Sequence, residues 1–325
     1  MLTLQGAFSS NPRVAPLIDG TVRVPGVEIR WEIFENPGVL FAKQMRDDAF
    51  DVFEFSISDY INIRSRPASR WDWTALPVFL SKALLQLNTW VNVRSGVAGA
   101  EDLKDKRLAV GDYTQTAFLW FRAMIERLYG IRSRDIFWYN GRGGQESHSV
   151  LLGLDTSPPE GVSITFLPGP EAINPLLQSG EIDAANATSM PIDTKSPLVR
   201  RLFPDLGKGF MEAFHSAVGF TPVNHTVGLK RRVVEANPWL PEALFEAFER
   251  SKEEAYRRDP GARNIVRKQE GLTWDGSGFG DDPYASGLAA NRTMLAMGVD
   301  QALKDGLIRE RVQADGLFWE SLRNT

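Results

Sequence analysis

The stretch 101–130, EDLKDKRLAVGDYTQTAFLWFRAMIERLYG, decides the fold. It begins with a short charged helix, continues into a buried strand from Arg107 to Val110, and turns at 111–115. A long helix with an apolar face begins near Thr116. A strand that runs directly into a helix N-terminus presents unpaired N–H groups and partial positive charge, which bind anions. The stretch therefore predicts an α/β unit whose turn holds the carboxylate of a small ligand.

The composition narrows the function classes. The chain has 325 residues, which suits two α/β lobes better than one ordinary domain. Its net charge is −4, so nucleic acid and anionic membrane surfaces are poor partners. The absence of cysteine excludes disulfides, thiolate catalysis and cysteine metal sites. The N-terminal sequence MLTLQGAFSSNPRVAP lacks the pattern of a signal peptide, and no apolar run reaches the roughly 20 residues of a membrane span. We expect a cytoplasmic protein.

Apolar alternation and short apolar runs predict strands separated by helices. Such alternation favours doubly wound sheets that bind ligands at the carboxyl ends of their strands. The predicted strands are 2–7, 27–34, 51–55, 75–80, 88–94, 107–110, 135–139, 162–166, one ending at 189–191, and 226–229. The predicted helices include 40–45, one beginning at 116, one after 237–238, 288–304 and 307–322, with a loop at 271–287.

The order of these segments resembles a type II periplasmic-binding-protein fold, in which the chain forms one α/β lobe, crosses to a second and returns. Segments 101–111 and 179–184 resemble the second lobe of solute-binding proteins. The resemblance implies a central mixed sheet in each lobe and a C-terminal helical tail. We place lobe 1 at 1–90 plus 226–325 and lobe 2 at 91–225, with the ligand cleft between them.

A narrower resemblance is to the 4,5-dihydroxyphthalate decarboxylase family. It is carried by short segments in a shared order: 17–20 (LIDG), 50–56 (FDVFEFS), 113–117 (YTQTA), 198–205 (LVRRLFPD), 222–227 (PVNHTV) and 284–287 (YASG) followed by Asn291-Arg292. The resemblance implies a cytoplasmic carbon–carbon lyase that needs no cofactor and decarboxylates a phthalate-like dihydroxy aromatic acid, of the 4,5-dihydroxyphthalate to protocatechuate type.

The chain departs from the family pattern at two places. At 10–13 it keeps only the arginine of an aromatic-Asp-Arg element, and Leu85-Gln86 stands where family members tend to carry Arg-His. A related aromatic or small carboxylate is therefore an equal alternative as the substrate.

Decarboxylation of such a ring requires an acid near the ring carbon that loses CO2. His225 is the first candidate because histidine is the common proton donor near neutral pH and 224–226 lies at the predicted return crossover. His148, beside Glu146 in a glycine-rich loop, is the second, with an exposed loop histidine as the alternative. Glu54, inside an apolar strand, is either an acid with a raised pKa or the partner of a cation.

Hydroxyl, amide and cationic groups near predicted strand ends are candidates for holding carboxylate oxygens. For the threonines and serines the alternative is helix capping, and for Arg13 it is a surface position. We propose that turns from both lobes hold the substrate and that lobe closure expels water. The candidate substrate-binding residues are Arg13, Ser56, Ser58, Lys82, Tyr113, Thr114, Gln115, Thr116 and Ser189.

Cofactors and partners are predicted from the same residues. A hydroxyl para to the leaving carboxylate can supply the electrons, so we expect no cofactor. The histidines lack metal-ligand spacing, although distant carboxylates leave a divalent metal open. The partner is a small aromatic carboxylate, and homo-oligomerisation stays open. The alternatives are a solute-binding protein or sensor without chemistry, and a thiamine-precursor-type enzyme on the same fold.

Overall fold

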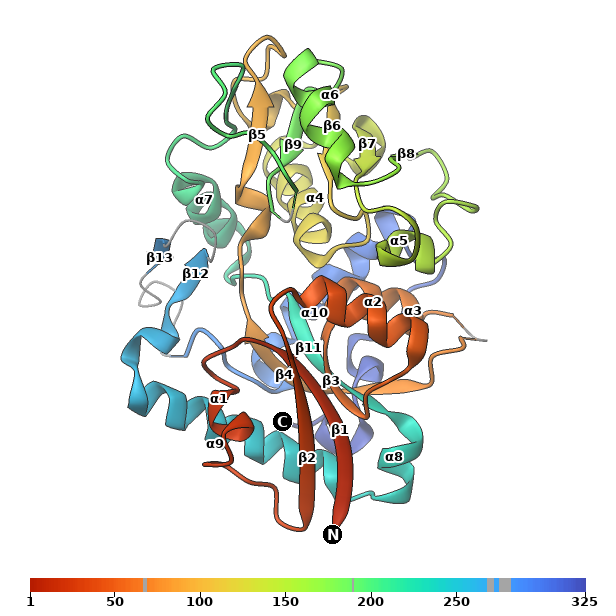
Figure 1. The fold of residues 1–325 in the computed structure, drawn as a ribbon, viewed down its shortest axis with the longest axis vertical. Helices are drawn as coiled ribbons and strands as arrows, with labels where there is room; N and C mark the ends of the chain where they lie inside the picture. Colours follow the sequence, from red (N-terminus) through yellow and green to blue (C-terminus); the bar gives the residue numbers. More distant parts are fainter. Residues whose placement is uncertain (67–68, 189, 268–271, 275–281) are drawn as a thin grey trace. The chain divides into compact units, whose positions relative to one another are not determined.

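The computed structural model describes residues 1–66, 69–188, 190–267, 272–274 and 282–325, which divide into two units (Figure 1). Unit 1 contains Met1–Ala83, Thr221–Val299 and Arg311–Thr325, and unit 2 contains Leu84–Phe220 and Asp300–Glu310. The predicted lobe boundaries at 90 and 225 lie a few residues after those of the structure. The segment 300–310, predicted in lobe 1, belongs to unit 2. Within the described ranges, no helix is both long and apolar enough to cross a membrane.

Unit 1 is built on a five-stranded mixed sheet in the order β2-β1-β3-β11-β4. Strand β1 is parallel to β2 and β3, whereas β11 is antiparallel to both of its neighbours, β3 and β4. The return strand β11 therefore lies inside the sheet, between two strands from the first part of the chain. The strands are β1 (Leu2–Ser9), β2 (Val27–Phe34), β3 (Val52–Ser56), β4 (Trp73–Ser81) and β11 (His225–Lys230).

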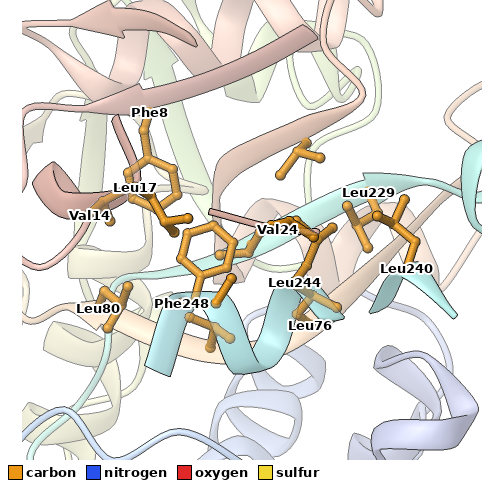
Figure 2. Packing of buried hydrophobic residues seen from close by; sticks show 14 of the residues in the cluster. Phe8, Val14, Leu17, Val24, Leu76, Leu80, Leu229, Leu240, Leu244 and Phe248 are labelled. Atoms are coloured by element: carbon orange, nitrogen blue, oxygen red, sulfur yellow. The ribbon is translucent and has the colours of Figure 1, made fainter. Parts of the chain in front are cut away.

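Helices cover both faces of this sheet. On one face, Phe41 of α2 packs edge-on against Phe55 of β3, with ring centroids 5.3 Å apart. On the other, Leu244 and Phe248 of α9 join the buried cluster shown in Figure 2, which also contains Val52 of β3. Every residue of β3 is buried, as expected for a strand covered on both faces. The helices of unit 1 are α1 (Ala15–Ile18), α2 (Pro37–Asp47), α3 (Ile57–Arg64), α8 (Arg231–Ala236), α9 (Leu240–Arg258) and most of α10 (Leu288–Lys304).

Unit 2 contains a six-stranded mixed sheet in the order β10-β5-β9-β6-β7-β8. The strands β9, β6, β7 and β8 are parallel, and β5 runs antiparallel between β10 and β9. The strands are β5 (Thr89–Asn92), β6 (Arg107–Val110), β7 (Phe137–Asn140), β8 (Ser163–Phe166), β9 (Ala184–Asn186) and β10 (Val199–Arg201). The helices are α4 (Thr116–Tyr129), α5 (His148–Leu151), α6 (Ile173–Ser179) and α7 (Lys208–Val218).

A buried ion pair ties the segment 300–310 to α4. The Nε of Arg122 lies 2.5 Å from Oδ2 of Asp305, and both side chains are almost fully buried. Arg122 also donates from Nη1 to the carbonyl of Tyr113 at 2.9 Å, and its guanidinium lies 4.1 Å over the Tyr113 ring. Removing one partner from such a pair leaves an uncompensated buried charge, so the contact fixes the return of the chain onto unit 2.

Most predicted elements are confirmed, and the boundaries of β2, β6 and α10 agree with the prediction. The charged helix before β6 is a 3₁₀ turn, Ala100–Asp102, and β9 ends at Asn186, before the predicted end at 189–191. Part of the predicted loop at 271–287 forms a strand, β13 (Leu272–Trp274), which pairs with β12 (Ile265–Arg267).

The predicted helix at 307–322 is wrong. In its place the chain forms 3₁₀ turns at Ala314–Leu317 and Glu320–Leu322. The N–H of Trp319 donates to the carbonyl of Ala75 at 3.0 Å, and Phe318 packs against Phe79. These contacts with β4 replace the hydrogen bonds that a helix would have made.

The buried cluster in Figure 2 allows us to predict how much a cavity in the core would destabilise the protein. Leu244 is fully buried on α9, so Leu244→Ala is expected to lower the free energy of unfolding by about 2–5 kcal/mol. Val39, on α2, is 46% exposed, and Val39→Ala is expected to change the free energy of unfolding by less than about 0.5 kcal/mol. Denaturant unfolding followed by circular dichroism measures both. Equal effects of the two substitutions would contradict the packing.

Candidate functional site

The first group of predicted site residues gathers at the carboxyl ends of β1, β3 and β4 in unit 1. His225, the first residue of β11, is the register partner of Ser56 at the end of β3 and of Ser81 at the end of β4. The order of the strands thus brings residues that are far apart in the sequence to one edge of the sheet. We call Arg13, Glu54, Lys82 and His225 the unit 1 cluster.

Glu54 and His225 form a hydrogen-bonded pair. The Nδ1 of His225 lies 2.7 Å from Oε1 of Glu54, and the N–H of Ser9 donates to Oε2 at 2.8 Å. The Glu54 side chain is 1% exposed, whereas that of His225 is 12% exposed. The ring of His225 also packs edge-on against Phe41. A carboxylate that accepts from Nδ1–H fixes the imidazole orientation and leaves Nε2 available to a ligand.

The carboxyl of Glu54 is held in its charged form. Burial alone would raise its pKa, but the charge and hydrogen bond of His225 and the hydrogen bond from Ser9 act in the opposite direction and prevail. The pKa of Glu54 therefore lies below its ordinary value. Of the two predicted alternatives, the structure favours a Glu54 that pairs with a cation over a Glu54 that donates a proton.

Arg13 is a buried cation. Its Nε donates to the carbonyl of Leu80 at 2.9 Å and its Nη1 to the carbonyl of Ala262 at 2.7 Å. The guanidinium lies 3.7 Å from the centroid of the Tyr284 ring, and burial lowers the pKa of Arg13. In the described part of the chain, Arg13 forms no salt bridge with a carboxylate. A buried cation whose contacts among the described residues are carbonyl groups and an aromatic ring can also bind an anionic ligand.

Lys82 lies directly after β4 and is partly buried. Burial lowers the pKa of its ammonium to about 8, and the negative charge of Asp282 opposes that shift. The described residues offer it neither a hydrogen bond nor an ion pair. Lys82 follows Ser81, the residue of β4 that is in register with His225.

Ser56 and Ser58 lie at the start of α3 in this unit. The Oγ of Ser56 accepts the N–H of Asp59 at 3.3 Å and caps α3, as the capping alternative predicts. Ser58 lies in the first turn of α3 and is fully buried. Their part in substrate binding stays a prediction.

Three residues that support the unit 1 cluster were not identified from the sequence. Asn224 accepts the N–H of Ala83 at 2.7 Å, which fixes the backbone beside Lys82. Tyr284 lies under Arg13, and Asp282 binds Lys252 at 2.7 Å. Asn224 and Tyr284 lie in the family-like segments 222–227 and 284–287, which were the available signal.

The second group of predicted residues lies in unit 2, at the turn between β6 and α4. Tyr113 is fully buried, and its hydroxyl donates to the carbonyl of Asp305 at 3.2 Å. Thr114 is buried and donates its N–H to Oγ of Ser149 at 3.3 Å. Gln115 is the N-cap residue of α4, and its side chain makes no capping hydrogen bond. Thr116 is the first residue of α4 and is buried.

A buried carboxylate organises the neighbouring loops of unit 2. Asp112 accepts hydrogen bonds from Arg142 at 2.9 Å, from the Ser147 hydroxyl at 2.5 Å and from the Ser149 N–H at 3.2 Å. His148, between these two serines, is 2% exposed, so the exposed-loop alternative is wrong. Asp112 thus holds the 141–149 loop against the start of α4.

The remaining predictions concern Ser189, metals and the cleft. Ser189 lies outside the described residues. Among those described, no three His, Asp or Glu side chains could together hold a metal ion. The two groups of site residues belong to different units, and a ligand cleft between the units stays a prediction.

The environment of Lys82 predicts an unusual titration. With its pKa lowered to about 8, the ammonium loses its proton as the pH rises through 8, and the nucleophilic amine forms there. Pulse acetylation at pH 6 to 11, with Lys82 modification read by mass spectrometry, is expected to show an inflection near 8. An inflection at the ordinary value of about 10.4 would contradict the burial of this side chain.

Comparison with known proteins identifies two relatives with the same name. A 4,5-dihydroxyphthalate decarboxylase from Comamonas testosteroni is 32% identical over 323 residues, which are 98% of this chain and 96% of that protein. A 4,5-dihydroxyphthalate decarboxylase from Pseudomonas putida is 31% identical over 190 residues, 58% of this chain and 72% of that protein. No family model matches the chain.

Solved structures with the same fold include binding proteins and an enzyme. The periplasmic aliphatic sulphonate binding protein SsuA from Escherichia coli superposes with a TM-score of 0.53 at 15% identity, covering 99% of both chains. The desulfurization enzyme DSZB superposes with a TM-score of 0.52 at 14% identity, covering 98% of this chain and 96% of that one. These similarities confirm the predicted periplasmic-binding-protein-like fold, and the fold alone does not separate binding from catalysis.

Proposed function

Because the chain belongs to the 4,5-dihydroxyphthalate decarboxylase family, we propose that it removes one carboxylate from 4,5-dihydroxyphthalate and releases CO2 and 3,4-dihydroxybenzoate. The observation that carries this proposal is the Glu54–His225 pair at the sheet edge that also presents Arg13. The pair can move a proton, and the buried cation can hold an aromatic carboxylate.

The reaction needs a proton at one ring carbon. The hydroxyl para to the leaving carboxylate pushes electron density into the ring, and the ring carbon that bears the carboxylate takes a proton. The bond to the carboxyl carbon then breaks, its electron pair returns to the ring, and CO2 leaves. Because the hydroxyl supplies the electrons, the proposed route uses no organic cofactor.

His225 is the proposed proton donor. With Nδ1 held by Glu54, the imidazolium presents Nε2–H to the substrate. Transfer of that proton leaves a neutral imidazole whose Nδ1–H still donates to the carboxylate, so the hydrogen bond persists through the step. The His225 ring is then reprotonated from solvent. A positive imidazolium is stabilised by the negative carboxylate that faces it.

Arg13 is the proposed clamp for a substrate carboxylate. Its Nε and Nη1 are tied to backbone carbonyls and its face rests on Tyr284, so the guanidinium has one orientation. Fixed donors lower the entropy cost of placing the ring against His225.

The location of the protein in the cytoplasm remains a prediction.

Turnover by the wild-type protein tests the proposal against a binding protein of the same fold. The protein is expected to release CO2 from 4,5-dihydroxyphthalate, with 3,4-dihydroxybenzoate formed in equal amount. Calorimetry on the same sample measures the affinity for 4-hydroxyphthalate and phthalate as analogues. Tight binding of the diacids without CO2 release would contradict the proposed enzyme activity and favour a sensor or a solute-binding protein.

Loss of the proton donor is expected to reduce turnover much more than binding. His225→Ala should lower kcat by about 10²–10⁴-fold, the usual contribution of general acid catalysis, with KM changed by only a few-fold. His215→Ala, on α7 of unit 2, is the matched histidine control and should leave both constants near wild type. A His225→Ala variant with turnover within a few-fold of wild type would remove His225 from the mechanism.

Glu54 acts through His225, so its replacement should lower the rate more than it weakens substrate binding. Glu54→Gln keeps the shape of the side chain and removes its charge, and its one amide oxygen can accept only one of the two hydrogen bonds from His225 and Ser9. We expect kcat to fall while KM changes by only a few-fold. A variant with kcat near wild type would remove Glu54 from the mechanism.

A further inference from the structure

We propose that β2 is the interface of a symmetric dimer, in which the β2 strands of two copies of this chain pair antiparallel and join two unit 1 sheets. The inference concerns a surface outside the unit 1 cluster and does not rest on the proposed function. It is carried by the outer edge of β2, by the two faces of its side chains and by the charges that one register of pairing brings together.

Strand β2 lies at one edge of the unit 1 sheet and presents backbone hydrogen-bonding groups on its outer side (Figure 1). The N–H of Ser10, directly after β1, donates to the carbonyl of Phe34 at 3.2 Å. Backbone groups alternate in direction along a strand, so every second residue counted back from Phe34 also faces β1. The N–H and C=O groups of Ile29, Trp31 and Ile33 therefore point outward, where they form no backbone hydrogen bond with the described residues.

The other edge strands of the two main sheets are covered or short. Along β4, the N–H of Trp319 donates to the carbonyl of Ala75, and the N–H of Gly287 donates to that of Pro77. In unit 2, the edge strands β8 and β10 have 4 and 3 residues, whereas β2 has 8. A long edge strand with unpaired backbone groups is a template for pairing with another chain. This property distinguishes β2 from the other edges.

The side chains of β2 form one apolar face and one charged face. Ile29 and Trp31 pack against the buried cluster of unit 1, whereas Ile33, on the same face, is 43% exposed. On the opposite face, the side chains of Arg30 and Glu32 are 64% and 49% exposed. Apolar surface and accessible charges thus accompany the outward backbone groups.

A single register of antiparallel pairing matches these side chains with themselves across a twofold axis. When the axis passes beside Trp31, Ile29 of each copy lies opposite Ile33 of the other. The outward N–H and C=O groups of these residues then bond across the interface in both directions, and the exposed Ile33 side chain is covered. Arg30 of each copy lies opposite Glu32 of the other, in the closely spaced type of pair, so this opposite-charge contact forms twice.

The neighbouring registers are less favourable. With the axis one residue earlier, Arg30 would face its own counterpart and Glu28 would face Glu32, which places like charges together. With the axis one residue later, Glu32 would face its counterpart. With the axis two residues earlier, Val27 would have to bond across the interface, but its N–H already donates to the carbonyl of Val24 at 3.1 Å.

The test is the oligomeric state of the full chain, measured by sedimentation velocity over a range of protein concentrations. The wild-type protein is expected to sediment as a dimer of the 36.3 kDa chain. Arg30→Glu and Glu32→Arg each turn both opposite-charge contacts into like-charge contacts, so each should weaken the dimer by about 10-fold or more. Mixing the two variants brings opposite charges together again, and a mixed dimer of near wild-type affinity is expected.

The matched control is Arg23→Glu, which makes the same change of charge at an exposed residue outside β2 and should leave the dimer unchanged. Circular dichroism checks that each variant is folded, because Glu32 also contacts Lys43 within its own chain.

Weakened dimers in both variants, rescued in their mixture, would support the pairing. A wild-type protein that stays monomeric at about 0.1 mM would overturn the inference. So would a dimer whose affinity is unchanged in both variants, or weakened variants that mixing does not rescue. Turnover of 4,5-dihydroxyphthalate is a separate readout, because Arg30 and Glu32 do not belong to the unit 1 cluster.

Discussion

The hydrogen bond between Glu54 and His225 is the interaction on which the unit 1 site depends. A carboxylate at 1% exposure needs partners that compensate its lost hydration, and it obtains them from the Ser9 N–H and the imidazole. These partners come from β1 and β11, on either side of β3. One buried acid therefore joins three strands and points one imidazole toward the end of the sheet.

The same unit also contains two cations, Arg13 and Lys82, that form no salt bridge with a carboxylate of the described residues. Lys252 is in ion-pair contact with both Asp282 and Glu249. Arg13 contacts carbonyl groups and an aromatic ring, and Lys82 is partly exposed to solvent. Functional sites often retain such costs because the ligand supplies the missing charge. The periplasmic-binding-protein-like fold accommodates this arrangement without dictating the chemistry, since its structural relatives include binding proteins and an enzyme.

The sequence predicted local structure correctly where a single local pattern was sufficient to identify the element. The alternation of 27–34 gave β2, and the strand-to-helix turn of 101–130 gave β6 and α4. The helix expected at 307–322 failed because contacts with Ala75 and Phe79, more than 200 residues earlier, hold the segment in short turns. Periodicity contains no information about such distant pairing.

The candidate site was predictable as a set of residues but not as an arrangement. Glu54 and His225 were each singled out, yet their pairing depends on the register of β3 and β11, which no local pattern specifies. Tyr113 was expected to offer its hydroxyl to a ligand, but in the structure the hydroxyl bonds Asp305, a residue of the C-terminal return. Tyr284 and Asp282 were missed because their importance follows from contacts with Arg13 and Lys252 across the fold.

The tautomer of His225 tests the central claim most directly. In ¹⁵N-labelled protein, the ring nitrogens of His225 report which of them carries a proton in the neutral imidazole. Because the Glu54 carboxylate can only accept, the account predicts that Nδ1 remains protonated across the neutral range and that the neutral ring is the Nδ1–H tautomer. A neutral ring with its proton on Nε2 would contradict the pairing with Glu54 and the mechanism built on it.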